Sequence, residues 1–219
     1  MTDPVSSDKR RYRGMDGPER QAARRASLLA AGLELFGTVG YVATTVEAVC
    51  REAGLAKKYF YESFADREAL MLAIYDDAVR RGQEAALVAV AGAGPTIEER
   101  IAAGLGAVIR ALGTDPRVTR LVFREIIRVA TPVSEERYRQ AKRDFAEFVI
   151  ADLTATAGIP RTKRMQMGTT QLVGAFNEIM TERVLGHLDA TLDEVTEITV
   201  TVFNVVYRQY MRELAEDAG

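Results

Sequence analysis

Residues 40–70 read GYVATTVEAVCREAGLAKKYFYESFADREAL. Thr44 precedes Glu47 by three positions, which is the spacing of a capping box, so we predict a short helix with Thr44 at its N-cap. Gly54 supplies a sharp turn, and the AKKYFY segment that follows is too short to be a stable helix alone. We expect the packing of Phe60 to hold that segment in place. The pattern therefore predicts two short helices joined at a glycine.

The second of these helices is basic and aromatic around Phe60. Neighbouring residues of a helix point about 100° apart, so the side chains beside a buried Phe60 face outward. A short basic helix after a turn is typical of a helix-turn-helix, whose second helix enters the DNA major groove. The alternatives are capping alone for the threonines and a solvated surface position for the lysines. The candidate DNA contacts are Thr44, Thr45, Lys57, Lys58, Tyr59 and Tyr61.

This stretch resembles the TetR family of bacterial transcriptional regulators. The resemblance covers about a third of the chain by ordered motifs, and the remainder by helical layout. It implies that Arg67 contacts phosphate, as the lysine at that place does in the family. Ala56, Glu62 and Ser63 depart from the family pattern, so the resemblance does not carry over an operator sequence. The motifs are Phe36, Gly40-Tyr41, Thr44-Thr45, Gly54-Leu55-Ala56, Tyr59-Phe60-Tyr61 and Phe64 to Leu70.

The chain is predicted to be all-α, because strand patterns are nearly absent. The first helix is expected to pack through Ala22, Ala26, Leu29, Leu33 and Phe36. Three parts are expected along the chain: a disordered basic tail at 1–17, a three-helix helix-turn-helix DNA-binding domain at 18–65, and a helical ligand-binding and dimerisation bundle at 66–219. Helices are expected near 18–38, 45–53, 56–62, from 67 into the eighties, through 101–112, at 117–130, through 138–148, at 162–185 and at 191–215.

Composition limits the class of protein. Apolar residues make up 47% of the chain, and no run approaches the roughly eighteen that span a membrane. One cysteine and no secretory signal favour a cytoplasmic location. The net charge is −2, yet residues 9–25 hold seven Lys/Arg against two Asp/Glu, which suits phosphate binding at one end. Within this edge, Lys9 to Arg13 are either a minor-groove arm or a solubilising tail.

Motifs for catalysis or metal binding are missing from the sequence. Cys50 is expected to pack inside a helix, and His187 to cap a helix end. One cysteine and one histidine do not make a convincing metal site. There is no glycine-rich phosphate loop, nucleophile elbow or paired-carboxylate motif. We therefore predict neither an enzyme nor a cofactor.

The last two predicted helices each carry two apolar faces, whereas a surface helix needs one. Either both helices are central in the monomer, or one face packs on the body and the other on a partner chain. The resemblance to the TetR family implies the second arrangement, with the two helices forming a four-helix dimer interface. The candidate interface residues are Val173, Met180, Val195, Ile198, Val202 and Val205.

A pocket in the helical body is expected to be mainly apolar and to take a lipophilic or aromatic effector. Ordinary core packing is the alternative for every candidate. The chain is thus predicted to be a homodimeric repressor released from a palindromic operator by a small ligand. A regulator without a ligand, and a helical carrier or enzyme with a vestigial DNA-binding domain, are the rivals. The pocket candidates are Phe123, Ile126, Phe145, Phe148, Phe176, Asn177 and Glu178.

Overall fold

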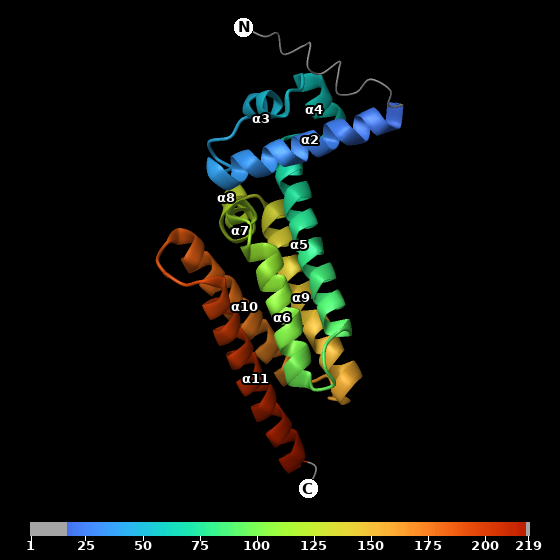
Figure 1. Cartoon of the computed structure of the whole chain (residues 1–219), viewed down its shortest axis with the longest axis vertical. Helices are drawn as coiled ribbons and strands as arrows, with labels where there is room; N and C mark the ends of the chain where they lie inside the picture. Colours follow the sequence, from blue (N-terminus) through green and yellow to red (C-terminus); the bar gives the residue numbers. More distant parts are fainter. Residues whose placement is uncertain (1–16, 218–219) are drawn as a thin grey trace.

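The structure is a computed structural model that describes residues 17–217. All the secondary structure of these residues is helical. Helix α2 lies across one end of the molecule with α3 and α4 beyond it, and the other long helices run lengthwise beneath (Figure 1). The elements are α2 (Gly17–Thr38), α3 (Val46–Ala53), α4 (Lys57–Ser63), α5 (Arg67–Ala91), α6 (Ile97–Gly113), α7 (Pro116–Arg120), η1 (Leu121–Glu125), α8 (Ile126–Val129), α9 (Pro132–Ala157), α10 (Lys163–Leu185) and α11 (Leu192–Asp217).

The short helices α3 and α4 are fixed by local chemistry at their ends. Thr45 is the N-cap of α3, and its Oγ1 accepts a hydrogen bond of 3.1 Å from the Ala48 backbone N–H. Gly54 closes the helix with φ 67°, a left-handed conformation that glycine adopts without steric cost. The prediction of a capping box at Thr44 was wrong by one residue. Thr44 is 1% exposed, and its hydroxyl donates to the Gly40 carbonyl at 2.7 Å.

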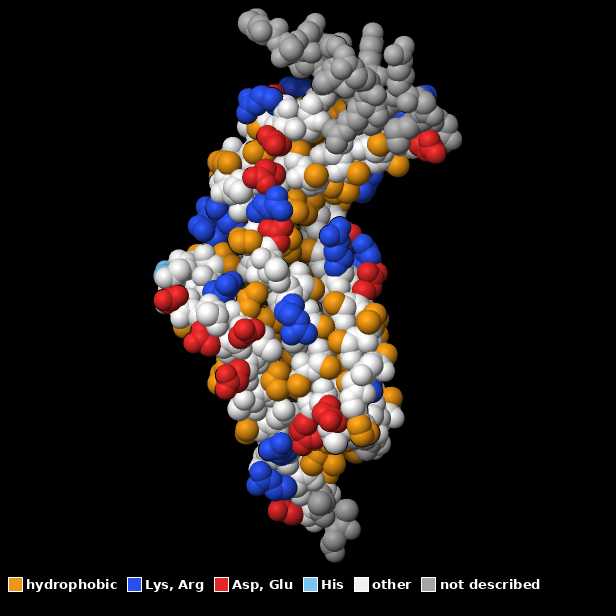
Figure 2. Space-filling model, viewed as in Figure 1, with side chains coloured by type: hydrophobic (Ala, Val, Ile, Leu, Met, Phe, Trp, Pro, Cys, Tyr) orange, Lys and Arg blue, Asp and Glu red, His pale blue; other side chains and the backbone are white. Residues whose placement is uncertain are grey.

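One hydrophobic core runs from the helix-turn-helix into the body, since Leu28, Phe60, Leu70 and Phe123 belong to the same buried cluster. The predicted inner face of α2 was only partly right. Its buried residues are Leu28, Ala31, Gly32, Phe36 and Gly37. Ala26, Leu29 and Leu33 instead line an apolar groove of about 320 Å³ between α2 and the body. Figure 2 shows exposed apolar side chains where α2 crosses the body.

The helix predicted at 117–130 is interrupted by one turn of π-helix, η1, and this turn joins the body to α2. Glu125 is 1% exposed and accepts hydrogen bonds from the Tyr41 backbone N–H at 2.8 Å and from Arg120 Nε at 3.1 Å. Arg120 also donates to the Thr38 carbonyl at 2.5 Å. A single buried carboxylate therefore connects η1 to the turn between α2 and α3.

The close approach of α2 and α7 depends on Gly37. A Cβ atom at that position would lie 2.5 Å from Arg117 Cβ and 2.7 Å from Arg117 Cα. Arg117 also forms an ion pair of 2.8 Å with Glu34, so the end of α2 is held against the body by packing and by charge.

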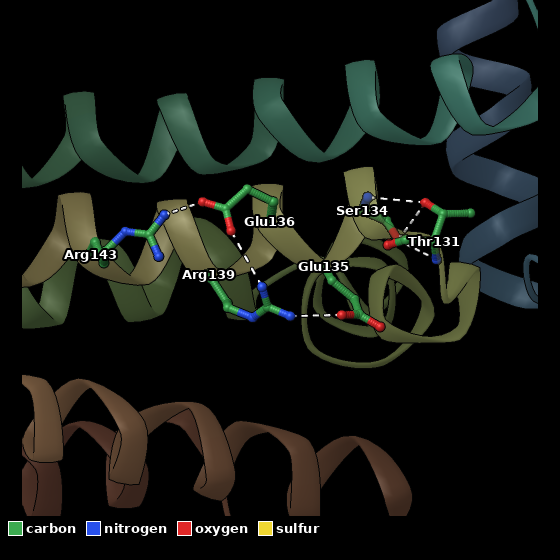
Figure 3. A network of polar contacts seen from close by, with 6 residues as sticks. All are labelled: Thr131, Ser134, Glu135, Glu136, Arg139 and Arg143. Atoms are coloured by element: carbon green, nitrogen blue, oxygen red, sulfur yellow. Dashed lines mark hydrogen bonds and ion pairs between the residues drawn. The ribbon is translucent and has the colours of Figure 1, made fainter.

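Helix α9 begins with a capping box between Thr131 and Ser134 (Figure 3). The Ser134 N–H donates to Thr131 Oγ1 at 3.1 Å, and the Thr131 N–H donates to Ser134 Oγ at 3.1 Å. Farther along α9, Arg139 pairs with Glu135 at 2.7 Å on the exposed face. Such exposed pairs contribute about 0–1 kcal/mol each, so they solubilise the helix more than they stabilise it.

Candidate nucleic-acid interface and body cavity

Helix α4 presents its polar side chains around one buried anchor. Phe60 is fully buried, as predicted, while Lys57 and Lys58 are exposed and Tyr61 is 58% exposed. Lys57 pairs with Glu47 of α3, and the hydrogen bond from Lys57 holds the pKa of that carboxyl below its usual range. A phosphate or a guanine would compete with Glu47 for this ammonium.

Tyr59 is half-buried between two cations. The Arg24 guanidinium lies 4.2 Å from its ring centroid, and the Lys58 ammonium lies 4.7 Å from it. Arg24 also lies 3.7 Å from Glu62, one of the residues that depart from the family pattern. Arg24 thus connects α2 to α4, while Tyr59 stays partly exposed and Lys58 exposed.

Of the remaining candidates, Thr45 is an exposed helix cap, whereas Thr44 and Arg67 make contacts that stabilise the domain. Thr45 is exposed at the N-terminus of α3, where its backbone dipole favours an anion. Thr44 is buried, so its hydroxyl is not available to phosphate, which corrects the prediction made for that side chain. Arg67 stacks over the Tyr41 ring at 4.2 Å and donates to the Thr44 carbonyl, so it ties α5 to the preceding turn. The basic run Lys9 to Arg13 lies outside the described residues.

The surface of the body has a different electrostatic character. Figure 2 shows Lys, Arg, Asp and Glu side chains interspersed over this face of the body, without one continuous patch of a single sign. No helix among residues 17–217 is long and apolar enough to cross a membrane. In the same described part of the chain, no group of three or more His, Cys, Asp or Glu is arranged to hold a metal ion.

The body contains a partly open apolar pocket of about 60 Å³, here called the first hollow, between α5, α6, η1, α9 and α10. Four of the predicted pocket residues line it, namely Phe123, Phe145, Phe176 and Asn177. The rings of Phe123 and Phe176 meet edge to face at 5.8 Å. Asn177 Nδ2 donates to the Val173 carbonyl at 2.8 Å, so its amide nitrogen is already engaged.

The other three pocket predictions fall elsewhere. Phe148 lines a second hollow of about 30 Å³. Ile126 is 1% exposed in the core and Glu178 is exposed on α10, and neither lines any of the described hollows, so both predictions were wrong.

Three polar residues around the first hollow were missed, Tyr75, Gln83 and Lys142. Burial raises the pKa of the Tyr75 phenol, so it stays protonated and can donate a hydrogen bond. Tyr75 and Gln83 lie on α5, and Lys142 lies on α9. Only the packing of these two helices brings the three side chains together.

Three of the six residues predicted for the dimer interface are buried in the single chain, and the other three are exposed. Val173, Met180 and Val195 are at most 2% exposed within the single chain, so they pack on its own body and their assignment to a dimer surface was wrong. Ile198, Val202 and Val205 lie along α11 and are 48%, 40% and 59% exposed. Gly174 and Ala175 of α10 are exposed as well. An apolar strip with small neighbours therefore remains uncovered on α10 and α11.

Residues 28–74 match the sequence model of the bacterial regulatory proteins of the tetR family. This match spans the second half of α2, all of α3 and α4, and the first turns of α5, which is the part of the chain that carries the exposed basic helix. Residues 28–74 therefore form a TetR-family domain. The helix-turn-helix of α3 and α4 is therefore a DNA-binding domain of this family.

Solved structures extend the TetR-family fold over most of the chain. The fatty acid degradation regulator FadR from Bacillus halodurans is 13% identical with a TM-score of 0.72, and the match covers 86% of this chain and 95% of that one. FadR from Bacillus subtilis, in complex with stearoyl-CoA, is 14% identical with a TM-score of 0.69 over 81% and 96% of the two chains. A TetR/AcrR regulator from Thermobifida fusca YX-ER1 is 24% identical with a TM-score of 0.57 over 82% and 95%. No curated protein sequence matches this chain. At these identities the likeness establishes the fold.

Proposed function

We propose that this chain is a homodimeric, sequence-specific transcription regulator, released from a palindromic operator by a small lipophilic or aromatic ligand. Residues 18–65 would read DNA, and residues 66–219 would dimerise and bind the ligand. The observation that carries the proposal is α4 itself, a basic helix held by a buried Phe60 inside a TetR-type domain.

The chemistry of α4 suits the reading of base edges. Lys57 and Lys58 stand in its first turn, from which an ammonium can reach guanine O6 and N7 or a phosphate oxygen. Tyr59 and Tyr61 can donate to phosphate or contact a thymine methyl group. Thr45 offers its hydroxyl at the start of α3, and Arg67 offers the outer edge of its guanidinium. The four side chains of α4 would give sequence specificity. Thr45 and Arg67 would fix the position of the domain on the DNA.

Dimerisation would cover the apolar strip of α10 and α11. Ile198, Val202 and Val205 occupy one side of α11, and their side chains would lose water contact against the same residues of a second copy. Two reading helices related by a two-fold axis meet half-sites about 34–36 Å apart. The expected operator is therefore a palindrome with one turn between the centres of its halves.

Ligand release would act through η1. Val122 and Phe123 line the first hollow, and Glu125, two residues later, holds the turn between α2 and α3. A ligand that shifts Phe123 would alter the bonds of Glu125 and tilt the DNA-binding domain. Coupling of this kind amounts to about 1–3 kcal/mol and weakens operator affinity about 5–150-fold. Bacillus subtilis FadR in complex with stearoyl-CoA supports a ligand in this fold.

The test is selection of bound duplexes from a random DNA pool, with wild type beside the double variant Lys58→Ala/Tyr59→Ala. Lys163→Ala, at the exposed start of α10, is the matched control. We expect wild type and the control to recover one palindrome that the double variant does not enrich. Binding without sequence preference in the wild type would contradict the proposal.

A regulator whose body only dimerises is the second candidate, because the first hollow has a volume of only about 60 Å³. The two candidates differ in one measurable respect. If no apolar compound shifts the affinity for the recovered palindrome, the body only dimerises.

A further inference from the structure

Three apolar hollows follow one another along the body, and neighbouring hollows share wall residues. The first, of about 60 Å³, and the second, of about 30 Å³, both have Phe145 in their walls. A third hollow of about 40 Å³ shares Ile101, Val149, Leu153 and Phe203 with the second. The row is continuous except where these side chains close it.

The row follows helix α9 from its middle toward its C-terminal end. Its lining residues on α9 run from Ala141 through Phe145 and Val149 to Leu153. At a helical rise of 1.5 Å per residue, this stretch is about 18 Å long. A compact aromatic molecule fills one hollow, whereas only an elongated apolar molecule can occupy all three.

Phe145 and Phe203 are the partitions. Phe145 is half-buried, stacks on Phe148 with ring centroids 6.4 Å apart, and borders both the first and the second hollow. Phe203 is 4% exposed and borders both the second and the third hollow. Rotation of these two rings would join the hollows into one tunnel.

The polar end of the row is the first hollow. Lys142 lies in its wall with its ammonium 4.4 Å from the Tyr138 ring centroid, and among the described residues no carboxylate lies within ion-pair distance of it. Gln83 also lines the first hollow and has no hydrogen bond with the described residues. Arg100 borders the second hollow, but its guanidinium is taken by Asp152 and by the Val90 carbonyl. The cation available to a ligand in this row is therefore Lys142.

We propose that the three hollows are segments of one site for the unbranched hydrocarbon chain of an anionic amphiphile, with its negatively charged head at Lys142. The inference rests on the proposed function in that it specifies the ligand of the same cavity. Phe145 sets the chain length that the site accepts, since it stands between the head end and the remaining length.

The experiment is calorimetric titration of the full-length protein with octanoate, dodecanoate and hexadecanoate, each below its aggregation limit. Each added methylene that enters the row should tighten binding by about fourfold. Phe145→Trp enlarges the partition and should remove the gain in affinity from octanoate to the longer chains. Val133→Trp, on the exposed face of α9, is the control of equal size.

A second pair of measurements addresses the head group. Lys142→Gln should weaken dodecanoate by about tenfold or more, because it removes one charge-assisted contact, and should leave the neutral dodecan-1-ol unchanged. Phe145→Leu, which fits the space of the ring, keeps the test valid if the tryptophan variant does not fold, and it should preserve or increase the gain with chain length.

The outcomes separate this inference from the function on which it rests. Affinity that does not rise with chain length, or a Phe145→Trp variant that weakens all three carboxylates equally, overturns the tunnel. Release from the recovered palindrome by a compact aromatic compound, with no binding of carboxylates, overturns the tunnel and leaves the regulator in place. Chain-length-dependent binding that does not change operator affinity supports the tunnel and contradicts ligand release.

Discussion

The DNA-binding end and the body use apolar side chains in opposite ways. In α3 and α4 a few anchors such as Phe60 are fully buried, and the functional side chains point outward from helices with defined ends. In the body the aromatic side chains Phe123, Phe145 and Phe176 surround hollows, and the functional surface faces inward. A rigid reading surface is thus attached to an interior that has room to rearrange, and η1 touches both.

The largest expected effect comes from the anchor of the reading helix. Phe60→Ala should lower the free energy of unfolding by about 3–5 kcal/mol, because it removes a fully buried ring from under a seven-residue helix. Tyr61→Ala, one position away and exposed, should cost less than about 0.5 kcal/mol. Urea unfolding followed by circular dichroism measures both. Equal losses would mean that α4 is not held by Phe60.

The second prediction concerns the link between the two regions. Glu125→Gln should destabilise the chain by about 1.5–3 kcal/mol, because the charge that Arg120 and the Tyr41 N–H share is removed from a buried site. Glu136→Gln, in an exposed pair on α9, should destabilise the chain much less, because solvent screens that pair. Thermal unfolding of the two variants side by side gives the comparison. If the Glu125 variant is as stable as the Glu136 variant, Glu125 does not hold η1 against the turn between α2 and α3.

A smaller effect of opposite sign is expected at Ala130. This residue ends α8 with φ 54°, a left-handed conformation that disfavours residues with a Cβ atom by about 1–2 kcal/mol. Ala130→Gly should recover part of that energy, reduced by the greater chain entropy of glycine when unfolded. A rise in the urea midpoint without a change in slope is the expected result, and a fall would show that the surrounding contacts favour alanine.

The smallest effect is a dependence on pH where α7 meets α2. Hydrogen bonds from Arg117 hold the pKa of Asp115 below its usual range, so the pair stabilises the fold above about pH 4 and is lost as the pH falls through the lowered pKa. Both side chains are more than a quarter exposed, so the contribution stays below about 1 kcal/mol. Asp115→Asn should flatten the pH dependence of the unfolding midpoint in that window. An unchanged profile would exclude a role for the pair.

The features that local chemistry determines were predictable from the sequence. The burial of Phe60 and the turn at Gly54 each follow from a few adjacent residues, and both were confirmed. Adjacent residues do not decide between Thr44 and Thr45 as the N-cap of α3, because both can cap a helix. The hydroxyl of Thr44 bonds instead to the Gly40 carbonyl, a contact set by the turn between α2 and α3.

Features that depend on which faces meet were not predictable. Both faces of α10 and α11 are apolar, so the pattern did not reveal that Val173, Met180 and Val195 pack inward while Ile198 and Val202 remain outside. The polar wall of the first hollow combines α5 with α9, two helices separated along the chain. The π-helical turn that includes Glu125 likewise has no local sequence signal that we recognised.

The most direct test of the central claim is the affinity for the recovered palindrome against a scrambled duplex at one salt concentration. The variant is Lys57→Ala/Lys58→Ala, and Lys163→Ala serves as the control. Wild type and control should prefer the palindrome by at least about a thousandfold, and the double variant should lose most of that preference because two base-edge contacts are removed. A double variant that keeps the full preference while binding both duplexes more weakly would mean that these lysines contact phosphate alone and that α4 does not read the sequence through them.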